Sequence, residues 1–85
     1  MELKEQFELA ITDSKNLPIR PTNDVLLQLY SLYKQATEGD NNMEPPTNAF
    51  DFVAKAKFDT WTAHKGKSAE NAMSEYVGLV NKLKN

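Results

Sequence analysis

The side chains best suited to hold a ligand are lysines that lie beside aromatic residues. Lys34 directly follows Tyr33. In the same way, Lys57 directly precedes Phe58. Ammonium groups donate charge-assisted hydrogen bonds to phosphate oxygens, and these bonds are stronger than those between neutral groups. The pattern is therefore compatible with a small anion-binding site. On charge alone, however, the lysine-rich stretch 55–67 is more often a solvated helix face.

Patterns that would indicate catalysis or a metal site are missing from the sequence. It contains no Gly-rich phosphate loop, no G-x-S-x-G and no H-E-x-x-H. Cysteine is absent, which excludes disulfides, thiolate ligands and a cysteine nucleophile. The one histidine, His64, cannot form a multi-histidine metal site, and we expect it to be solvated or to cap a helix. We therefore expect no enzymatic activity, no catalytic or metal-ligating residues and no cofactor.

The size and composition indicate one small globular domain over residues 1–85. For a chain of 85 residues, about 63% of the unfolded surface would be buried on folding. No apolar run approaches the ~20 residues that cross a bilayer, and the charged N-terminus has no signal-peptide core. We therefore expect a cytoplasmic protein without an integral membrane segment.

The charge is distributed unevenly along the chain. Residues 1–51 carry nine acids and four bases, a net charge of −5, whereas residues 52–85 carry three acids and six bases, a net charge of +3. Nucleic-acid-binding domains are usually basic overall, but this chain has a net charge of −2. We therefore expect no nucleic-acid partner, and any anion site must be local.

Hydrophobic periodicity and helix-end signals predict four helices and no strand. The helices cover residues 3–16, 22–38, 51–65 and 69–83, with a loop over 40–50. Pro18 and Pro21 end the first helix, because proline lacks an N–H group and disfavours helix before it. Gly39 and Gly66 provide C-terminal stops for the second and third helices, and Ser68 can cap the fourth. The fold class is therefore all-α.

The second helix, which Thr22 or Asn23 can cap, has an unusually wide apolar surface. Its apolar and aromatic residues cover roughly 200° of its circumference, whereas a stripe of ~100° or a little more is usual. The width favours two contact surfaces, one for the core and the other for a further helix or a ligand. The alternative that both sides are core in a crowded small bundle stays open. Lys34 lies at the edge of that second surface.

The large apolar residues of the C-terminal half fit a core better than a ligand site. Trp61 lies on the apolar stripe of the third helix, and Met73 lies on that of the fourth. Phe58 shares the stripe of Trp61 but neighbours Lys57, so its place between core and site stays open.

Three segments of the chain resemble the acyl-CoA-binding protein family. They read YSLYKQATEGD at 30–40, DFVAKAKFDTW at 51–61 and KGKSAENAM at 65–73. The resemblance extends from Phe7 to Leu83. It implies an all-α, four-helix up-down bundle with a shallow bowl, which binds long-chain fatty acyl-CoA without catalysis.

The resemblance also implies a division of the site between the two halves of the ligand. Residues expected to contact the CoA moiety are Lys15, Tyr30, Tyr33, Lys34, Lys57 and Tyr76. Residues expected to contact the acyl chain are Phe7, Ala10, Ile11, Leu26, Leu27 and Phe58. The chain departs from the family at Val53, where lysine is common, and at Phe58, where tryptophan is usual. Pro45-Pro46 replaces the usual Arg-Pro in a loop that is one residue longer.

These observations favour a monomeric carrier that buffers and transports medium- to long-chain fatty acyl-CoA esters inside the cell. Two other functions stay open, a helical protein-interaction module that uses the same apolar surface and a regulatory domain whose occupancy is sensed by another protein. Tyrosines paired with lysines favour the carrier, because a groove for a helix needs no phosphate-binding cations. Transient contacts with membranes or with enzymes that use acyl-CoA would accompany such a role.

Overall fold

The computed structural model describes residues 1–48 and 50–84, which fold into four α-helices. The helices are α1 (Leu3–Ser14), α2 (Asn23–Glu38), α3 (Phe52–Thr62) and α4 (Ala69–Lys84). The predicted all-α class and the order of the elements are confirmed. The third helix ends earlier than predicted, because the chain turns before Gly66, which has a positive φ of 87°. No described helix is long and apolar enough to span a membrane.

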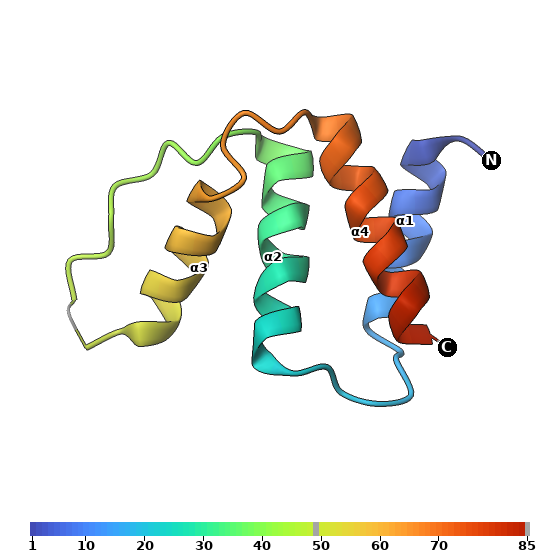
Figure 1. Ribbon diagram of the computed structural model, residues 1–85, viewed down its shortest axis with the longest axis horizontal. Coiled ribbons are helices and arrows are strands. Elements are labelled where there is room, and N and C mark those ends of the chain that lie inside the picture. Colours follow the sequence, from blue (N-terminus) through green and yellow to red (C-terminus); the bar gives the residue numbers. More distant parts are fainter. Residues whose placement is uncertain (49, 85) are drawn as a thin grey trace.

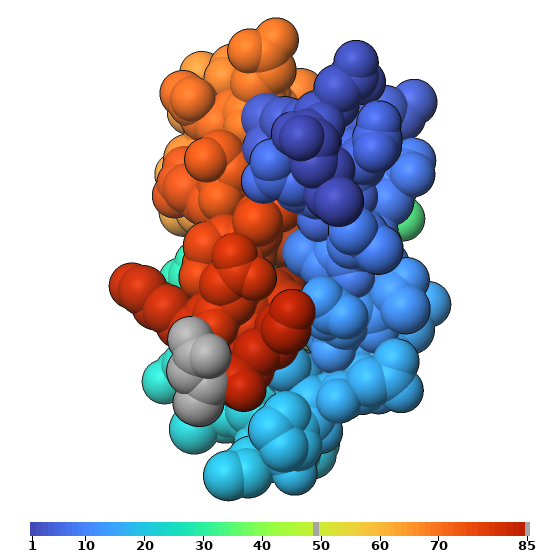
Figure 2. Space-filling view, turned by 90° about the vertical axis from the view of Figure 1, so that its right-hand side faces the viewer, coloured from blue at the N-terminus to red at the C-terminus, as the bar shows by residue number. Residues whose placement is uncertain are grey.

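The four helices form a thin layer of about 41 × 28 × 15 Å. Across Figure 1 the order is α3, α2, α4 and α1, so that α4 packs between α1 and α2. Figure 2 shows α1 and α4 in contact along their lengths. The helices do not strictly alternate in direction, because α3 runs parallel to α2 (Figure 1).

The main core lies between α1, α2 and α4. Its buried members are Phe7, Ala10, Leu29, Leu32, Ala36, Ala72, Tyr76 and Val80. The Tyr76 ring meets the Phe7 ring edge to face at 5.2 Å, and the Tyr76 hydroxyl donates to Ser14 Oγ at 3.2 Å. Met73 packs against this cluster, as its position on the apolar stripe predicts. One face of α2 therefore supplies the core, and its wide apolar surface leaves a second face for α3.

Trp61 attaches α3 to the C-terminal end of α2. Its side chain is 2% exposed, and its indole Nε1–H donates to Gly39 O at 2.9 Å. Gly39 ends α2 with a positive φ of 81°, a conformation that side chains other than glycine rarely adopt. Of the described helices, α3 packs against α2 alone. The assignment of Trp61 to a structural role is therefore confirmed.

A buried amide completes this attachment and extends it to the start of α4. Gln35 is fully buried, and its Nε2 donates to Asp40 Oδ1 and to Lys67 O, each at 2.9 Å. The backbone N–H of Gly66 donates to the same Asp40 oxygen at 2.8 Å. These donors, Gly66 first and Gln35 second, hold the pKa of Asp40 below its ordinary value. We call this cluster, together with the Trp61–Gly39 bond, the Gln35–Asp40 junction.

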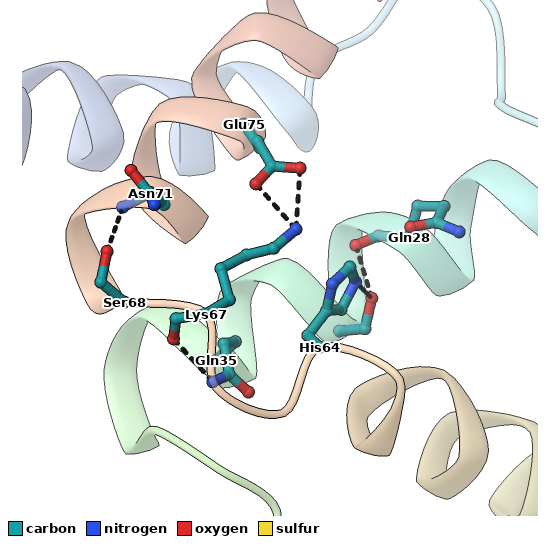
Figure 3. A network of polar contacts seen from close by, with 8 residues as sticks. Gln28, Gln35, His64, Lys67, Ser68, Asn71 and Glu75 are labelled. Carbon is teal, nitrogen blue, oxygen red and sulfur yellow. Dashed lines mark hydrogen bonds and ion pairs between the residues drawn. The ribbon is translucent and has the colours of Figure 1, made fainter.

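His64 contributes a second polar link between the α3–α4 turn and α2 (Figure 3). Its Nε2 lies 3.0 Å from Ser31 Oγ, and the Ser31 hydroxyl donates to Gln28 O at 3.0 Å. When the hydroxyl proton is used in this way, Ser31 Oγ accepts from the imidazole, and this arrangement requires the tautomer with a proton on Nε2. Nearby, Lys67 forms an ion pair with Glu75 at 2.7 Å. His64 is therefore a half-buried linking residue, and the expectation of a solvated or capping histidine is wrong.

We predict that Trp61→Ala lowers the free energy of unfolding by about 3–5 kcal/mol, because a large buried side chain is lost and a cavity remains. Trp61→Phe retains most of the apolar volume and leaves Gly39 O without its donor, so the expected loss is smaller, about 1–3 kcal/mol. Urea denaturation of the three proteins measures both values. A loss below about 1 kcal/mol for Trp61→Ala would contradict the buried role, since that range is typical of surface changes.

We also predict that His64 makes stability depend on pH below neutrality. Burial lowers the pKa of His64 below 6.5, and the positive charge of Lys67 adds to this effect. Protonation therefore favours the unfolded chain, so the stabilisation is present above about pH 6.5 and is lost as the pH falls. His64→Gln retains a donor for Ser31 and does not titrate. Between pH 7.5 and pH 5, the urea midpoint should fall further for the wild type than for this variant, and equal falls would refute the assignment.

Candidate ligand-binding site

A pocket of about 640 Å³ lies between the N-terminal halves of α2 and α3. The two helices meet at their C-terminal ends, where the Gln35–Asp40 junction holds them, and they diverge toward their N-terminal ends (Figure 1). The lining residues are Arg20, Asn23, Leu26, Leu27, Tyr30, Phe52, Val53, Ala56 and Lys57. Because helical positions three and four residues apart share a face, each helix presents a mostly apolar wall to this space. We call this space the α2–α3 pocket.

A second pocket of about 340 Å³ lies between α3 and the loop that follows α2. Its lining residues are Tyr30, Met43, Glu44, Pro46, Ala54, Lys57, Phe58 and Trp61. Tyr30 and Lys57 line both pockets, so they stand at the boundary between them. Asn41 holds the loop onto α3, since its Nδ2 donates to Thr62 Oγ1 at 3.1 Å.

Two ammonium groups flank the Tyr30 ring at this boundary. Lys57 Nζ lies 5.1 Å from the Tyr30 ring centroid. Lys34 Nζ lies 6.0 Å from the same centroid and 5.5 Å from that of Trp61. Such distances allow cation–π attraction, which holds both charges near the ring in the absence of an anion. Each lysine therefore places a positive charge beside Tyr30.

Lys34 already has an acidic partner on its own helix. Its Nζ lies 2.6 Å from Glu38 Oε2, one helical turn further along α2. This hydrogen bond is the main reason that the pKa of Lys34 is raised above 10.5, so the side chain is charged at neutral pH. Any anion that binds Lys34 must share this lysine with Glu38 or displace the carboxylate.

The structure brings one group of the predicted ligand residues together and places the others elsewhere. Leu26, Leu27, Tyr30 and Lys57 line the α2–α3 pocket. Phe58 lines the second pocket. Lys34 lies beside the rings of Tyr30 and Trp61, which also line that pocket. Phe58 therefore lines a pocket and is not a member of the core cluster, and its contact with an acyl chain stays a prediction.

The predicted residues of α1 and α4 lie on the core side of α2. Phe7 and Ala10 are each 4% exposed, and together with Tyr76 they belong to the core cluster. Ile11 packs half-buried against the same cluster, and Lys15 follows the last turn of α1. Phe7, Ala10, Ile11 and Tyr76 therefore contact the core, whereas Lys15 is exposed. A role in ligand contact stays a prediction for each of these residues.

Tyr33 lies between the two groups of residues. Its ring stacks on Phe7 at a centroid distance of 6.1 Å, and its side chain is partly exposed. On α2 it is three residues after Tyr30 and adjacent to Lys34. An elongated ligand that contacts both groups would therefore have to pass over Tyr33.

The α2–α3 pocket has five lining residues that are not among the predicted ligand contacts, namely Arg20, Asn23, Phe52, Val53 and Ala56. Arg20 lies in the connection between α1 and α2, where no periodicity indicates the direction of a side chain. Phe52 occupies the first turn of α3 and faces the pocket although it is largely exposed. Arg20 and Val53 line the same pocket. Val53 occupies the position at which lysine is common in the family that the sequence resembles, so Arg20 supplies a positive charge to a pocket that lacks this lysine. No acidic residue lines this pocket among the described residues.

Comparisons with known proteins agree with one another over nearly the whole chain. Residues 4–80 match the family model described as acyl CoA binding protein. The acyl-CoA-binding protein homolog of Drosophila melanogaster is 44% identical over 81 residues, covering 95% of this chain and 93% of that protein. The acyl-CoA-binding protein of Gossypium hirsutum is 47% identical over 83 residues, covering 98% and 92%.

Solved structures give the same result at the level of the fold. The crystal structure of Oryza sativa acyl-CoA-binding protein 2 superposes with a TM-score of 0.89 at 40% identity, covering 96% of this chain and 90% of that chain. The corresponding protein of Moniliophthora perniciosa superposes with a TM-score of 0.88 at 38% identity, covering 98% and 80%.

Proposed function

Because the chain belongs to the acyl-CoA-binding protein family, we propose that it binds medium- to long-chain fatty acyl-CoA esters without transforming them. In this proposal one domain over residues 1–85 acts as a cytoplasmic monomer that buffers and carries the ester. The observation that carries the proposal is the position of Tyr30. It lies at the boundary between the two pockets, and the ammonium groups of Lys34 and Lys57 lie beside its ring.

The chemistry of the site suits a ligand with one charged and one apolar half. Lys34 and Lys57 would donate charge-assisted hydrogen bonds to phosphate oxygens over the Tyr30 ring. The acyl chain would lie against Leu26 and Leu27 in the α2–α3 pocket, which has room for a long apolar chain. Each buried methylene contributes about 0.8 kcal/mol, so affinity should grow with chain length until the pocket is filled.

The two halves depend on each other because the pockets are open. A fatty acid alone would leave the ammonium groups of Lys34 and Lys57 without a phosphate partner. Free CoA would leave the apolar walls of the α2–α3 pocket exposed to water. We therefore expect neither half to bind as tightly as the complete ester. A site built for a partner helix would show no such preference, since phosphate is not part of that interaction.

Isothermal titration with palmitoyl-CoA, free CoA and palmitate tests this proposal, and the ester should bind most tightly. Lys34→Met and Lys57→Met should each weaken ester binding roughly 10- to 150-fold, as expected for a charge-assisted bond worth ~1.5–3 kcal/mol. Lys82→Met, near the C-terminal end of α4, serves as the control and should bind like the wild type. Palmitate binding as tightly as palmitoyl-CoA would exclude the proposed division of the site.

A further variant tests the competition between Glu38 and the ligand for Lys34. Glu38→Gln removes the ion pair and a negative charge beside the proposed phosphate site. Because a partly exposed ion pair contributes about 0–1 kcal/mol, affinity for palmitoyl-CoA should rise up to about fivefold, and the gain should shrink at high salt. Glu70→Gln makes the same charge change in the first turn of α4 and should leave affinity unchanged. Weaker binding by Glu38→Gln would show that the carboxylate positions Lys34 for the ligand instead of competing with it.

A further inference from the structure

One cation of the α2–α3 pocket has no partner within the described part of the chain. Arg20 lines the pocket from the α1–α2 connection. Lys34, Lys55, Lys67 and Lys84 each form an ion pair with a carboxylate. The Arg20 guanidinium forms neither an ion pair nor a hydrogen bond with any described residue. Its N–H donors are therefore available to a ligand in the pocket.

Arg20 lies at the end of the pocket opposite the proposed phosphate site. Lys57 and Tyr30 line the end at which the phosphates would bind, and Asn23 lines the end at which α2 begins. A helical rise of about 1.5 Å per residue places Asn23 about 10 Å before Tyr30 along α2. Arg20 precedes α2 in the connection at the lower end of Figure 1. The pocket therefore has an apolar middle and a polar group at each end.

We propose that Arg20 binds a carboxylate at the far end of the acyl chain, so that the protein accepts CoA monoesters of long-chain dicarboxylic acids. The proposal rests on the proposed function, in which the phosphates bind over Tyr30 and the acyl chain follows Leu26 and Leu27. A chain laid in this direction ends beside Arg20. Guanidinium and carboxylate groups are both planar, and they can form two parallel charge-assisted hydrogen bonds.

The length of the apolar wall decides which chains can reach Arg20. Carbon–carbon bonds of about 1.5 Å advance an extended chain by roughly 1.3 Å per methylene. About eight carbons therefore cover the distance from Tyr30 to Asn23, and Arg20 lies beyond them. A chain of about six carbons ends among apolar side chains, whereas a chain of about twelve brings its terminal carboxylate to Arg20.

The charges along the pocket favour a terminal carboxylate. An ionised carboxylate is costly to place against apolar walls unless it gains a partner. Arg20 and Lys57 line this pocket, and no acidic residue lines it among the described residues. The side-chain amide of Asn23 can donate a further hydrogen bond at the same end. Because Arg20 is exposed, water and salt weaken the ion pair, and we expect a moderate gain in affinity.

A CoA phosphate is the other anion that Arg20 could contact, and the two roles predict different results. A residue that binds phosphate contributes to the affinity of every CoA ester, whatever group ends the acyl chain. A residue that binds the terminal carboxylate contributes only when this carboxylate is present. The affinities of two esters that differ only at the chain end therefore separate the two roles.

The first test is isothermal titration with dodecanoyl-CoA and with the mono-CoA ester of dodecanedioic acid. Arg20→Gln should weaken binding of the dicarboxylic ester about three- to tenfold, and it should change dodecanoyl-CoA affinity less than about twofold. The loss should shrink at high salt. Arg20→Lys retains the charge without the planar fork and should lose less than Arg20→Gln. Lys82→Gln, which removes a positive charge from the last turn of α4, is the control and should bind both esters like the wild type.

The second test uses hexanoyl-CoA and the mono-CoA ester of hexanedioic acid, whose carboxylate ends short of Arg20. The ratio of their two affinities should be the same for the wild type and Arg20→Gln. Equal weakening of both dodecanoic esters would overturn the proposal in favour of a phosphate contact. Unchanged binding of the dodecanedioic ester, or the same dependence on Arg20 for the short pair, would also overturn it. Failure of the wild type to bind dodecanoyl-CoA would instead refute the proposed function, because this ester has no terminal carboxylate.

Discussion

The hydrogen bond from the Trp61 indole to Gly39 O is the constraint on which the candidate site depends. Among the described helices α3 packs against α2 alone, so its position depends on that packing and on the junction at its C-terminal end. Gly39 can present its carbonyl there because its positive φ turns the chain sharply at the end of α2. The helices are therefore held together at their C-terminal ends and stand apart at their N-terminal ends, where the α2–α3 pocket opens.

This arrangement explains why α2 has such a wide apolar surface. One part of its circumference packs with α1 and α4, and the adjoining part carries Leu26, Leu27 and Tyr30 toward α3. The charges follow the same division, because Lys34 and Lys57 approach Tyr30 from two helices. Glu38 balances one of these charges in the structure without ligand. The site thus combines an apolar wall with two cations, one of which is paired with a carboxylate.

The string at 30–40, by which the family is recognised, contains two kinds of residue. Tyr30 and Lys34 stand at the pocket boundary, whereas Gln35, Gly39 and Asp40 form the junction that positions α3 and the start of α4. Gln35 is fully buried and bonds across 32 residues to Lys67 O. A substitution in this string can therefore abolish binding without touching the ligand, because it alters the separation of α2 and α3.

The sequence by itself determined the four helices, their caps and stops, the all-α class and the family, because these depend on signals between residues close along the chain. Thr22 and Ser68 cap helices as predicted, and Gly39 ends α2 with a positive φ, whereas α3 ends at Thr62, before the predicted stop at Gly66. Only the tertiary structure decided that α3 runs parallel to α2 and that His64 bonds to Ser31. It also decided that Phe7 and Ala10 lie in the core and that Arg20 lines a pocket. Each of these outcomes depends on contacts between distant parts of the chain. Periodicity identifies which face of a helix is apolar, but the element that covers this face is selected by packing in three dimensions.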